Sequence, residues 1–383
     1  MNIRDTARDV FSYVKNINPE EEALSILEKK IETSHIQNLK DAIIKDRQKF
    51  NDLFCAFDEK QEEFFSELPH DEPSHKYVKK LLADGVVKVS GLMPQEEVEE
   101  VKEFQDLVQK SVHPHEHESG YVSLCTTPPD RNHFYNHWRQ FISNQSVRWQ
   151  WSPLLNKGQI RIQSKNFGGL HAPGANRFIE NSVLQKIFAH YNSIAKASGQ
   201  IDRTNLEWIY PSPINHNGWH RDLTIHSLKA MVLLNDIDEH SAPMLFAKGS
   251  HRMSGEFDKQ HHYDMFCLPV AKNRQGNVED SSKDEWPKYA SLEVHCGYIN
   301  EENAPNDIHP KERQSGREIT IGGDQYELFV CDGKAGDVVF FDSCGLHSGC
   351  RAHDKTRRSI VFSTSKSLSP KSIFFNMMQQ GGV

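Results

Sequence analysis

Three residues, two of them close together in the sequence and the third far along the chain, have side chains that could together bind one metal ion. His220 and Asp222 are two positions apart, so on an extended strand both side chains point to the same side. His347 could supply a third ligand. Two histidines and one carboxylate occupy one face of an octahedral Fe(II) ion and leave the other positions open for a cosubstrate and dioxygen. Because the H-x-D pattern is common, the sequence around it decides whether it indicates a metal site.

The same chain contains two similar patterns, at residues 262–264 (H-x-D) and 70–72 (H-x-E). The first lies in a polar stretch after the Gly-Ser-His sequence at 249–251, and the second precedes the jelly-roll signals and has no strand directly after it. Only the pattern at 220–222 is followed in order by 249–251 and by His347. We therefore interpret the other two as surface polar residues, and His251 as a structural residue beside a turn.

Short apolar runs bounded by turn residues predict most of the fold. A helix is expected after Met93-Pro94 and another over residues 181–197. Short strands with few helices favour a β-sandwich or barrel with flanking helices. The predicted strands contain residues 85–91, 159–162, 206–210, 230–234, 326–330, 336–341 and 359–363.

The domain organisation follows from changes in composition. Residues 1–75 are charged and show helical spacing of apolar residues, which predicts a helical N-terminal extension that could also form a homodimer. Residues 76–383 form the main domain. Within it, residues 254–330 are polar and weakly periodic, and this predicts an insertion or lid.

Composition excludes several classes of protein. A net charge of −8 over 383 residues argues against a nucleic-acid-binding protein. The seven cysteines are scattered, so neither a disulfide framework nor a zinc cluster is indicated. No apolar run approaches the length that spans a membrane, so no membrane association and a cytoplasmic location are expected.

With these features in order, the chain resembles the phytanoyl-CoA dioxygenase-like family of Fe(II)/2-oxoglutarate oxygenases over roughly 80–253 and 330–365. The resemblance implies a mainly β fold with flanking helices, whose core is a double-stranded β-helix (a cupin-like jelly roll). It also implies that His220, Asp222 and His347 bind iron. The motifs that carry it are Asp84-Gly85-Val86-Val87, Gly91-Leu92, Glu96-Glu97-Val98, His220-Arg221-Asp222, Gly249-Ser250-His251, Ala335-Gly336-Asp337, His347 and Arg357-Arg358-Ser359.

By the same resemblance, an arginine on the strand after His347 anchors the far carboxylate of 2-oxoglutarate. The planar guanidinium suits this role because it binds a carboxylate bidentately and keeps its charge. Arg357 and Arg358 are both candidates, and adjacent residues of a strand face opposite sides. We favour Arg357, because Ser359 would then lie on the same face and add a hydroxyl to the same carboxylate.

The implied reaction uses Fe(II), 2-oxoglutarate and O2 to oxidise a C–H bond of a small molecule, with release of succinate and CO2. An aspartate at position 222 argues against halogenation, because halogenating relatives have glycine or alanine there. A non-catalytic jelly-roll binding protein and a zinc hydrolase that uses the same ligands are the alternatives. Basic and polar residues before the H-x-D motif form either a solvated loop or a site for an anionic or zwitterionic substrate. In the second case the candidate substrate contacts are Arg161, Lys165, Arg177 and His133.

Overall fold

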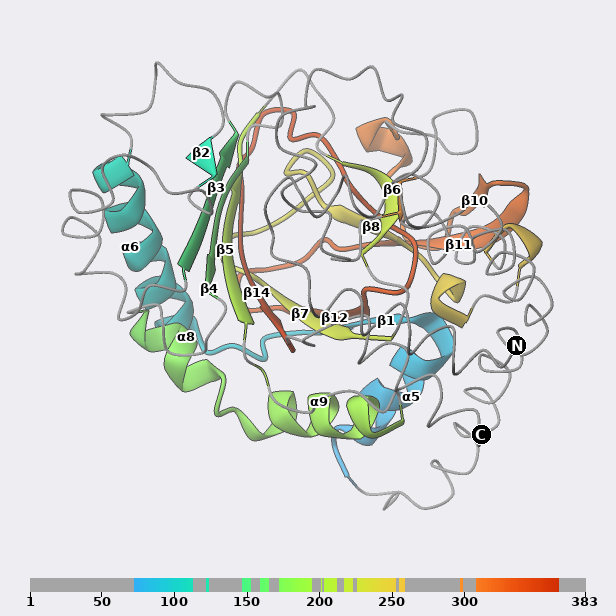
Figure 1. Ribbon diagram of the computed structural model, residues 1–383, viewed down its shortest axis with the longest axis horizontal. Helices are drawn as coiled ribbons and strands as arrows, with labels where there is room; N and C mark the ends of the chain where they lie inside the picture. Colours follow the sequence, from blue (N-terminus) through green and yellow to red (C-terminus); the bar gives the residue numbers. More distant parts are fainter. Residues whose placement is uncertain are drawn as a thin grey trace, which may run out of the picture.

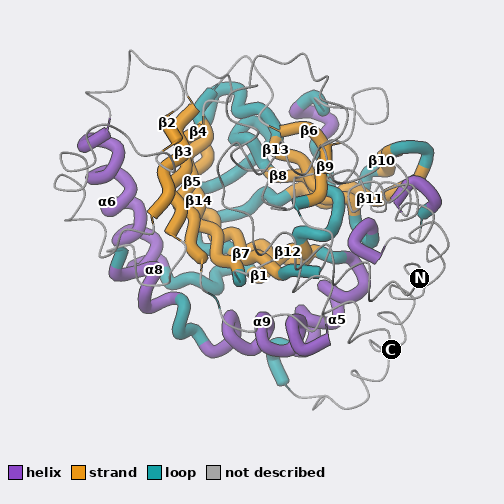
Figure 2. The backbone as a smooth tube through the Cα atoms, viewed as in Figure 1, coloured by secondary structure: helices purple, strands orange, loops and turns teal. Residues whose placement is uncertain are grey.

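Two antiparallel β-sheets face each other and helices cover the outer side of the larger one (Figure 1, Figure 2). The computed structural model describes residues 72–112, 122–123, 147–152, 159–164, 172–194, 201, 203–211, 217–222, 226–252, 255–258, 297–298 and 308–364. The N-terminal helices expected over residues 1–75, and the homodimer through them, fall almost entirely outside these ranges.

The larger sheet has eight strands in the order β1-β12-β7-β14-β5-β4-β3-β2. Every pair of neighbours in it is antiparallel. Its strands are β1 (Val86–Val89), β2 (Val122–Ser123), β3 (Val147–Ser152), β4 (Gln159–Ser164), β5 (Arg203–Ile209), β7 (Leu228–Leu233), β12 (Val338–Asp342) and β14 (Arg357–Ser363).

The smaller sheet has six strands in the order β10-β11-β8-β13-β6-β9. From β5 to β8 and again from β11 to β14, consecutive strands lie in alternate sheets, which is the winding of a double-stranded β-helix. The predicted jelly-roll core is confirmed. The strands are β6 (Asn217–Arg221), β8 (Met244–Ala247), β9 (Gly297–Tyr298), β10 (Glu318–Ile321), β11 (Asp324–Val330) and β13 (His347–Gly349).

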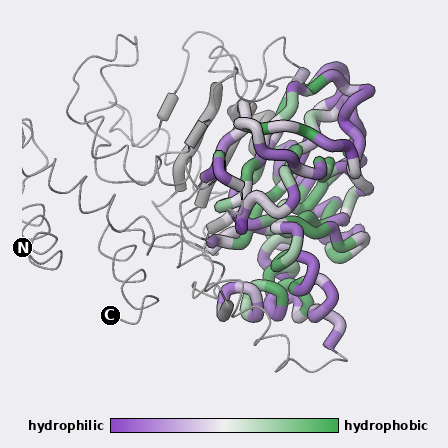
Figure 3. Tube along the Cα trace, turned by 90° about the vertical axis from the view of Figure 1, so that its right-hand side faces the viewer, coloured by the Kyte–Doolittle hydropathy of each residue, from purple (hydrophilic) through white to green (hydrophobic). Residues whose placement is uncertain are grey.

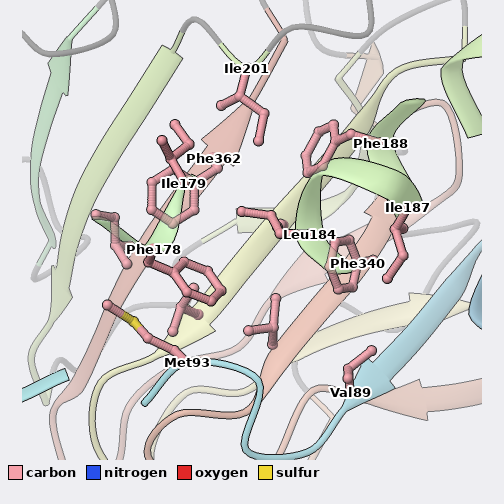
Figure 4. Close-up of a cluster of buried hydrophobic side chains, with 14 of the residues drawn as sticks. Val89, Met93, Phe178, Ile179, Leu184, Ile187, Phe188, Ile201, Phe340 and Phe362 are labelled. Carbon is pink, nitrogen blue, oxygen red and sulfur yellow. The ribbon is translucent and has the colours of Figure 1, made fainter. Parts of the chain in front are cut away.

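Strands β1, β7 and β12 of the larger sheet are buried on both faces, which explains why they read as nearly continuous apolar runs. On β12, Phe340 packs under the helices with Phe188, whereas Phe341 joins the cluster between the sheets. The close-up in Figure 4 shows the helix-covered cluster. The helices are α5 (His75–Asp84), α6 (Gln95–Val112), α8 (Pro173–Phe178) and α9 (Ser182–Ile194), with short 3-10 turns η2 (Ser250–Arg252) and η5 (Pro310–Glu312).

The smaller sheet also buries its outer face. Leu245 of β8, Leu328 of β11 and Ile308 contribute to one apolar cluster there. Apolar segments gather in the middle of the described part, and hydrophilic segments are more frequent toward its rim (Figure 3).

Part of the polar stretch 254–330 belongs to the smaller sheet rather than to an insertion. Its last part forms the hairpin β10–β11, and β11 pairs with β8 within the smaller sheet. The exposed positions alternate with buried ones along β10, so its high polarity reflects an edge strand rather than a loop. Residues 259–296 and 299–307 lie outside the described residues, and the lid stays a prediction.

Phe362 tests the packing of the helices on the larger sheet. Its side chain is fully buried and lies against Phe178, with ring centroids 5.8 Å apart. We expect Phe362→Ala to lower the free energy of unfolding by about 3–5 kcal/mol, because it leaves a cavity under the helices. Urea denaturation measures this, with Leu107→Ala as the exposed control. An equal effect of the two substitutions would contradict this packing.

Candidate metal centre

The structure brings His220, Asp222 and His347 together on the inner face of the smaller sheet. His220 and His347 are register partners on the antiparallel strands β6 and β13, and their ring centroids are 4.3 Å apart. Asp222 follows β6 directly, and its backbone N–H donates to the Ser343 carbonyl at 3.0 Å. One ligand atom of each of the three residues lies within 4.8 Å of the others. Among the described residues this is the one group of its kind.

The residues next to the two histidines on β6 and β13 point to the outer face of the smaller sheet. Trp219 and Leu346 belong to the apolar cluster outside the smaller sheet. Since side chains alternate along a strand, His220 and His347 must face the larger sheet. The ring of His347 is also 5.5 Å from that of Phe341, which lies between the sheets.

Both histidines have their Nδ1 atom engaged by a backbone carbonyl two residues earlier. The distance is 2.8 Å from His220 Nδ1 to Gly218 O and 2.9 Å from His347 Nδ1 to Gly345 O. A carbonyl only accepts, so Nδ1 carries the proton and Nε2 keeps its lone pair for a ligand. Burial lowers the pKa of His347, and His220 lowers it further. The neutral ring that a metal ligand needs is thus favoured.

Asp222 completes the set with its carboxylate between the two rings. Its oxygens are 3.5 Å from His220 Nε2 and 3.3 Å from His347 Nε2. The ammonium of Lys229, on β7 of the opposite sheet, contacts the same carboxylate. Burial alone would raise the pKa of the Asp222 carboxyl, but the ammonium of Lys229 holds it well below its usual range. Asp222 is therefore ionised and available as an anionic ligand.

A buried carboxylate, Asp342, holds the turn that carries His347. One of its oxygens accepts from the backbone N–H groups of Ser227 and Cys344, at 3.0 and 2.9 Å. The other accepts from Tyr191 Oη and His226 Nδ1, both at 2.5 Å. Burial would raise its pKa, yet the charge and hydrogen bond of His226 hold it far below its ordinary value. Asp342 thus joins α9 and β7 to the metal-ligand turn.

Arg221, between the two ligands of β6, points to the outer side and is fully buried. Its guanidinium donates to the Ser250 and Cys344 carbonyls and pairs with Asp258. It therefore joins the ligand strand, the 249–251 turn and the turn before His347. His251 is also fully buried, with Nε2 3.0 Å from the Leu82 carbonyl, and burial lowers its pKa to about 3. The structural role expected for His251 is confirmed.

Arg357 and Ser359 face the space between the sheets, as the preferred register predicts. Val361 on the same face of β14 belongs to the cluster between the sheets. Arg357 is buried, donates to the Ala242 carbonyl at 2.9 Å and pairs with Glu207 of β5 at 3.4 Å. The Ser359 hydroxyl is buried and makes no hydrogen bond. An unsatisfied buried hydroxyl beside a guanidinium fits a site for a carboxylate ligand.

Arg358 lies on the opposite face of β14, against helix α6. Its guanidinium donates to Gln105 Oε1 and to the Lys102 carbonyl, each at 2.7 Å, and pairs with Asp106 at 2.9 Å. All of these partners belong to α6. Arg358 therefore attaches the helix to the sheet and does not face the metal ligands.

The four residues expected to contact a substrate differ in their placement. Arg177 lies on α8, and its guanidinium pairs with Glu100 of α6 at 2.7 Å. The neighbouring Phe178 packs on the helix-covered side of the larger sheet, so the structure does not bring Arg177 to the metal ligands. The role of Arg177 as a substrate contact stays a prediction. Arg161 is the register partner of Glu207. Lys165 and His133 lie outside the described residues.

Sequence reasoning missed Lys229, Asp342, Arg221 and Glu207 as neighbours of the site. Arg221 lies between two predicted metal ligands, and Asp342 ends the predicted strand that leads to His347. Their positions in the sequence could have indicated that they lie near the site. The sequence indicated Lys229 less clearly. This residue is seven positions after Asp222, at the start of a strand whose other residues are apolar. A lone charge in such a strand is costly to bury unless it meets an opposite charge.

The jelly roll and its inward-facing His-Asp-His set define a mononuclear metal oxygenase site of the type with three protein ligands. The model of the family "Phytanoyl-CoA dioxygenase (PhyH)" matches residues 81–359. The chain therefore belongs to this family and is a non-haem iron and 2-oxoglutarate-dependent oxygenase. The donor set fits iron, since both histidines present Nε2 and the carboxylate is ionised.

Comparison with solved structures finds distant similarity. AviO1 from Streptomyces viridochromogenes Tue57 shares 13% identity, with 76% of this chain and 95% of that chain covered and a TM-score of 0.38. The epimerase SnoN in complex with Fe3+, alpha ketoglutarate and nogalamycin RO shares 14%, with 76% and 82% covered and a TM-score of 0.40. EctD from S. alaskensis with 2-oxoglutarate and 5-hydroxyectoine shares 14%, with 78% of each chain covered and a TM-score of 0.40.

No curated protein matches the chain significantly. Among the helices in the described ranges, none combines the length and the apolar character needed to cross a bilayer.

Asp342→Asn tests the role of the buried carboxylate in stability. The pKa of this carboxyl is lower in the folded than in the unfolded chain, so its ionised form stabilises the fold above about pH 4, and this contribution is lost as the pH falls further. We expect the substitution to cost about 3 kcal/mol at pH 7. Urea denaturation of the metal-free protein measures the free energy of unfolding of both proteins. The difference in this free energy between wild type and the variant should become smaller below pH 4.

Asp236→Asn is the matched control, because Asp236 is exposed and pairs with the surface residue Lys334 at 2.7 Å. We expect little change in stability from this variant. If the free energies of unfolding of wild type and Asp342→Asn differ by the same amount from pH 7 to pH 3, the stabilising role of the ionised Asp342 carboxylate is contradicted.

Proposed function

We propose that this protein oxidises an unactivated C–H bond of a small polar or anionic metabolite, by hydroxylation, desaturation or oxidative cyclisation. The observation that carries the proposal is the shared inner face of the jelly roll. The His-Asp-His set lies on the smaller sheet, and Arg357 with Ser359 lies on the larger sheet, both facing the space between the sheets.

Each group has a defined task in this proposal. His220, Asp222 and His347 hold iron, and Arg357 with the Ser359 hydroxyl binds the far carboxylate of 2-oxoglutarate. Iron, 2-oxoglutarate and dioxygen together supply an oxidation that yields succinate and carbon dioxide. The chain must then orient the substrate C–H bond at the open side of the ligand set and exclude water from it.

The charges on the inner face support a polar or anionic substrate. Lys229 is cationic beside the ligand set, and Arg357 pairs with Glu207 on the inner face of the larger sheet. Arg161 of β4, the register partner of Glu207, stays a candidate contact from the sequence. Lys165 and His133 stay candidate contacts from the sequence. An intact ligand set and a buried arginine on the strand after His347 distinguish this arrangement from a jelly roll that only binds ligands and from a zinc hydrolase.

The function is tested with protein reconstituted with Fe(II) and 2-oxoglutarate and exposed to oxygen. Without a substrate we expect slow formation of succinate. With the right member of a library of polar and anionic metabolites, succinate should form faster. Asp222→Ala should lower turnover by at least about 100-fold, because it removes a metal ligand. Tight zinc binding with hydrolysis, and no succinate from any mixture, would contradict the proposal.

The two adjacent arginines give a test of cosubstrate binding. We expect Arg357→Ala to raise the KM for 2-oxoglutarate by roughly 10- to 100-fold, because it removes charge-assisted hydrogen bonds to a carboxylate. Arg358→Ala should lower the thermal stability by detaching α6 and leave that KM nearly unchanged. Steady-state succinate assays and thermal melts of both variants provide the comparison, and the reverse ranking of the KM values would overturn the assignment of Arg357.

A further inference from the structure

The turn at residues 342–345 is bonded to two of the three metal ligands through its backbone carbonyls. The Ser343 carbonyl accepts from the backbone N–H of Asp222 at 3.0 Å. The Gly345 carbonyl accepts from Nδ1 of His347 at 2.9 Å. One of these bonds places the backbone of a ligand, and the other sets the direction of a ligand ring. The position of this short turn therefore bears on how the ligands converge.

The carboxylate of Asp342, at the start of the turn, lies on the helix-covered side of the larger sheet. Phe340, two residues earlier on β12, and Leu228, the register partner of Asp342 on β7, both belong to the cluster under the helices. One Asp342 oxygen accepts from the N–H groups of Ser227 and Cys344, at 3.0 and 2.9 Å. The turn is thus ordered from the side of the sheet that faces away from the metal ligands.

Tyr191 of α9 holds the other oxygen of this carboxylate. Its hydroxyl donates to Asp342 Oδ2 at 2.5 Å, and His226 Nδ1 lies at the same distance from the same oxygen. Tyr191 is fully buried, and Leu184 and Phe188 of the same helix are buried in the helix-covered cluster (Figure 4). The packing of α9 therefore presents the hydroxyl at a fixed place on the sheet.

The hydroxyl of Tyr191 needs an explanation beyond core packing, because a phenylalanine would fill nearly the same space. A hydroxyl in an apolar cluster is unfavourable unless it is hydrogen-bonded, and here the Asp342 carboxylate accepts its bond. The same carboxylate orders the turn that is bonded to Asp222 and His347. The contacts form one continuous path from a helix on the outer side of the domain to two metal ligands.

We propose that Tyr191 and His226 are positioning residues for the metal centre, and that they act through Asp342. Their hydrogen bonds keep the 342–345 turn in the place where the ligands converge on one ion. The inference rests on the proposed function in one respect, the assignment of the His-Asp-His set as the metal ligands. Residues that hold metal ligands in place commonly contribute roughly 10- to 100-fold to metal affinity.

The experiment measures the affinity of the metal-free protein for Mn(II) by titration calorimetry. For Tyr191→Phe we expect the dissociation constant for Mn(II) to rise about tenfold, because loss of the hydroxyl loosens the turn that aligns the ligands. Hydrogen exchange of the metal-free protein, followed by mass spectrometry, gives a second readout. Peptides that span residues 342–347 should exchange faster in the variant than in wild type, because the turn is held less firmly.

Phe188→Leu is the matched control, because Phe188 is a fully buried aromatic residue of the same helix, whose ring packs against Phe340 with centroids 6.1 Å apart. We expect it to lower the melting temperature at least as much as Tyr191→Phe does, and to leave the Mn(II) affinity within about twofold of wild type. If Tyr191→Phe does not fold, His226→Phe is measured in its place, with the same expectation, because it removes the other donor to the same oxygen.

Three results would overturn the inference and leave the ligand set intact. An unchanged dissociation constant for Mn(II) in the folded variant would show that the hydrogen bond does not position the ligands. An equal loss of affinity in Phe188→Leu would show that metal affinity follows the stability of the domain alone. Weaker Mn(II) binding without faster exchange at 342–347 would exclude the turn as the route. If wild type itself binds no Mn(II), the proposed function fails together with the inference.

Discussion

The site depends on the register between β6 and β13, which places His220 directly opposite His347. Side chains alternate along both strands, so a slip of one residue would turn the ligands out of the jelly roll and bring Trp219 or Leu346 into it. The apolar cluster outside the smaller sheet opposes such a slip, because it buries those two residues. Apolar packing on one face of the sheet thus fixes the position of the metal ligands on the other.

Buried polar groups around the site serve the same geometry. Asp342 and Arg221 meet at the turn before His347, where one accepts from the Cys344 N–H and the other donates to its carbonyl. Each is surrounded by partners, so the cost of burying its charge is offset by several charge-assisted hydrogen bonds. These bonds connect α9, β7, β6 and the 249–251 turn. The ligand set therefore rests on the whole frame of the domain rather than on a local loop.

Charge is distributed unevenly between the two sheets. The smaller sheet contributes the metal ligands, and the larger sheet contributes Lys229, Arg357 and Glu207 on its inner face. The ion pair between Arg357 and Glu207 keeps the guanidinium compensated inside the protein, and Lys229 does the same for Asp222. Both cations therefore have a partner within the chain, and an anionic ligand entering between the sheets meets charges that are already positioned.

The sequence by itself indicated the ligand types and most strands, because H-x-D spacing and runs of apolar residues act over a few neighbouring positions. The jelly-roll class followed from the resemblance of its motifs to the oxygenase family. The sequence also favoured Arg357 over Arg358, because Arg357 shares its face of the strand with Ser359. The tertiary structure decided that Lys229 meets Asp222, that Asp342 supports the turn before His347, and that Arg177 pairs with Glu100 of α6. It also showed that the polar residues 318–330 form an edge hairpin. These features depend on pairing between segments that are distant in the chain, or on burial of one face of an element, and the local pattern of residues contains neither.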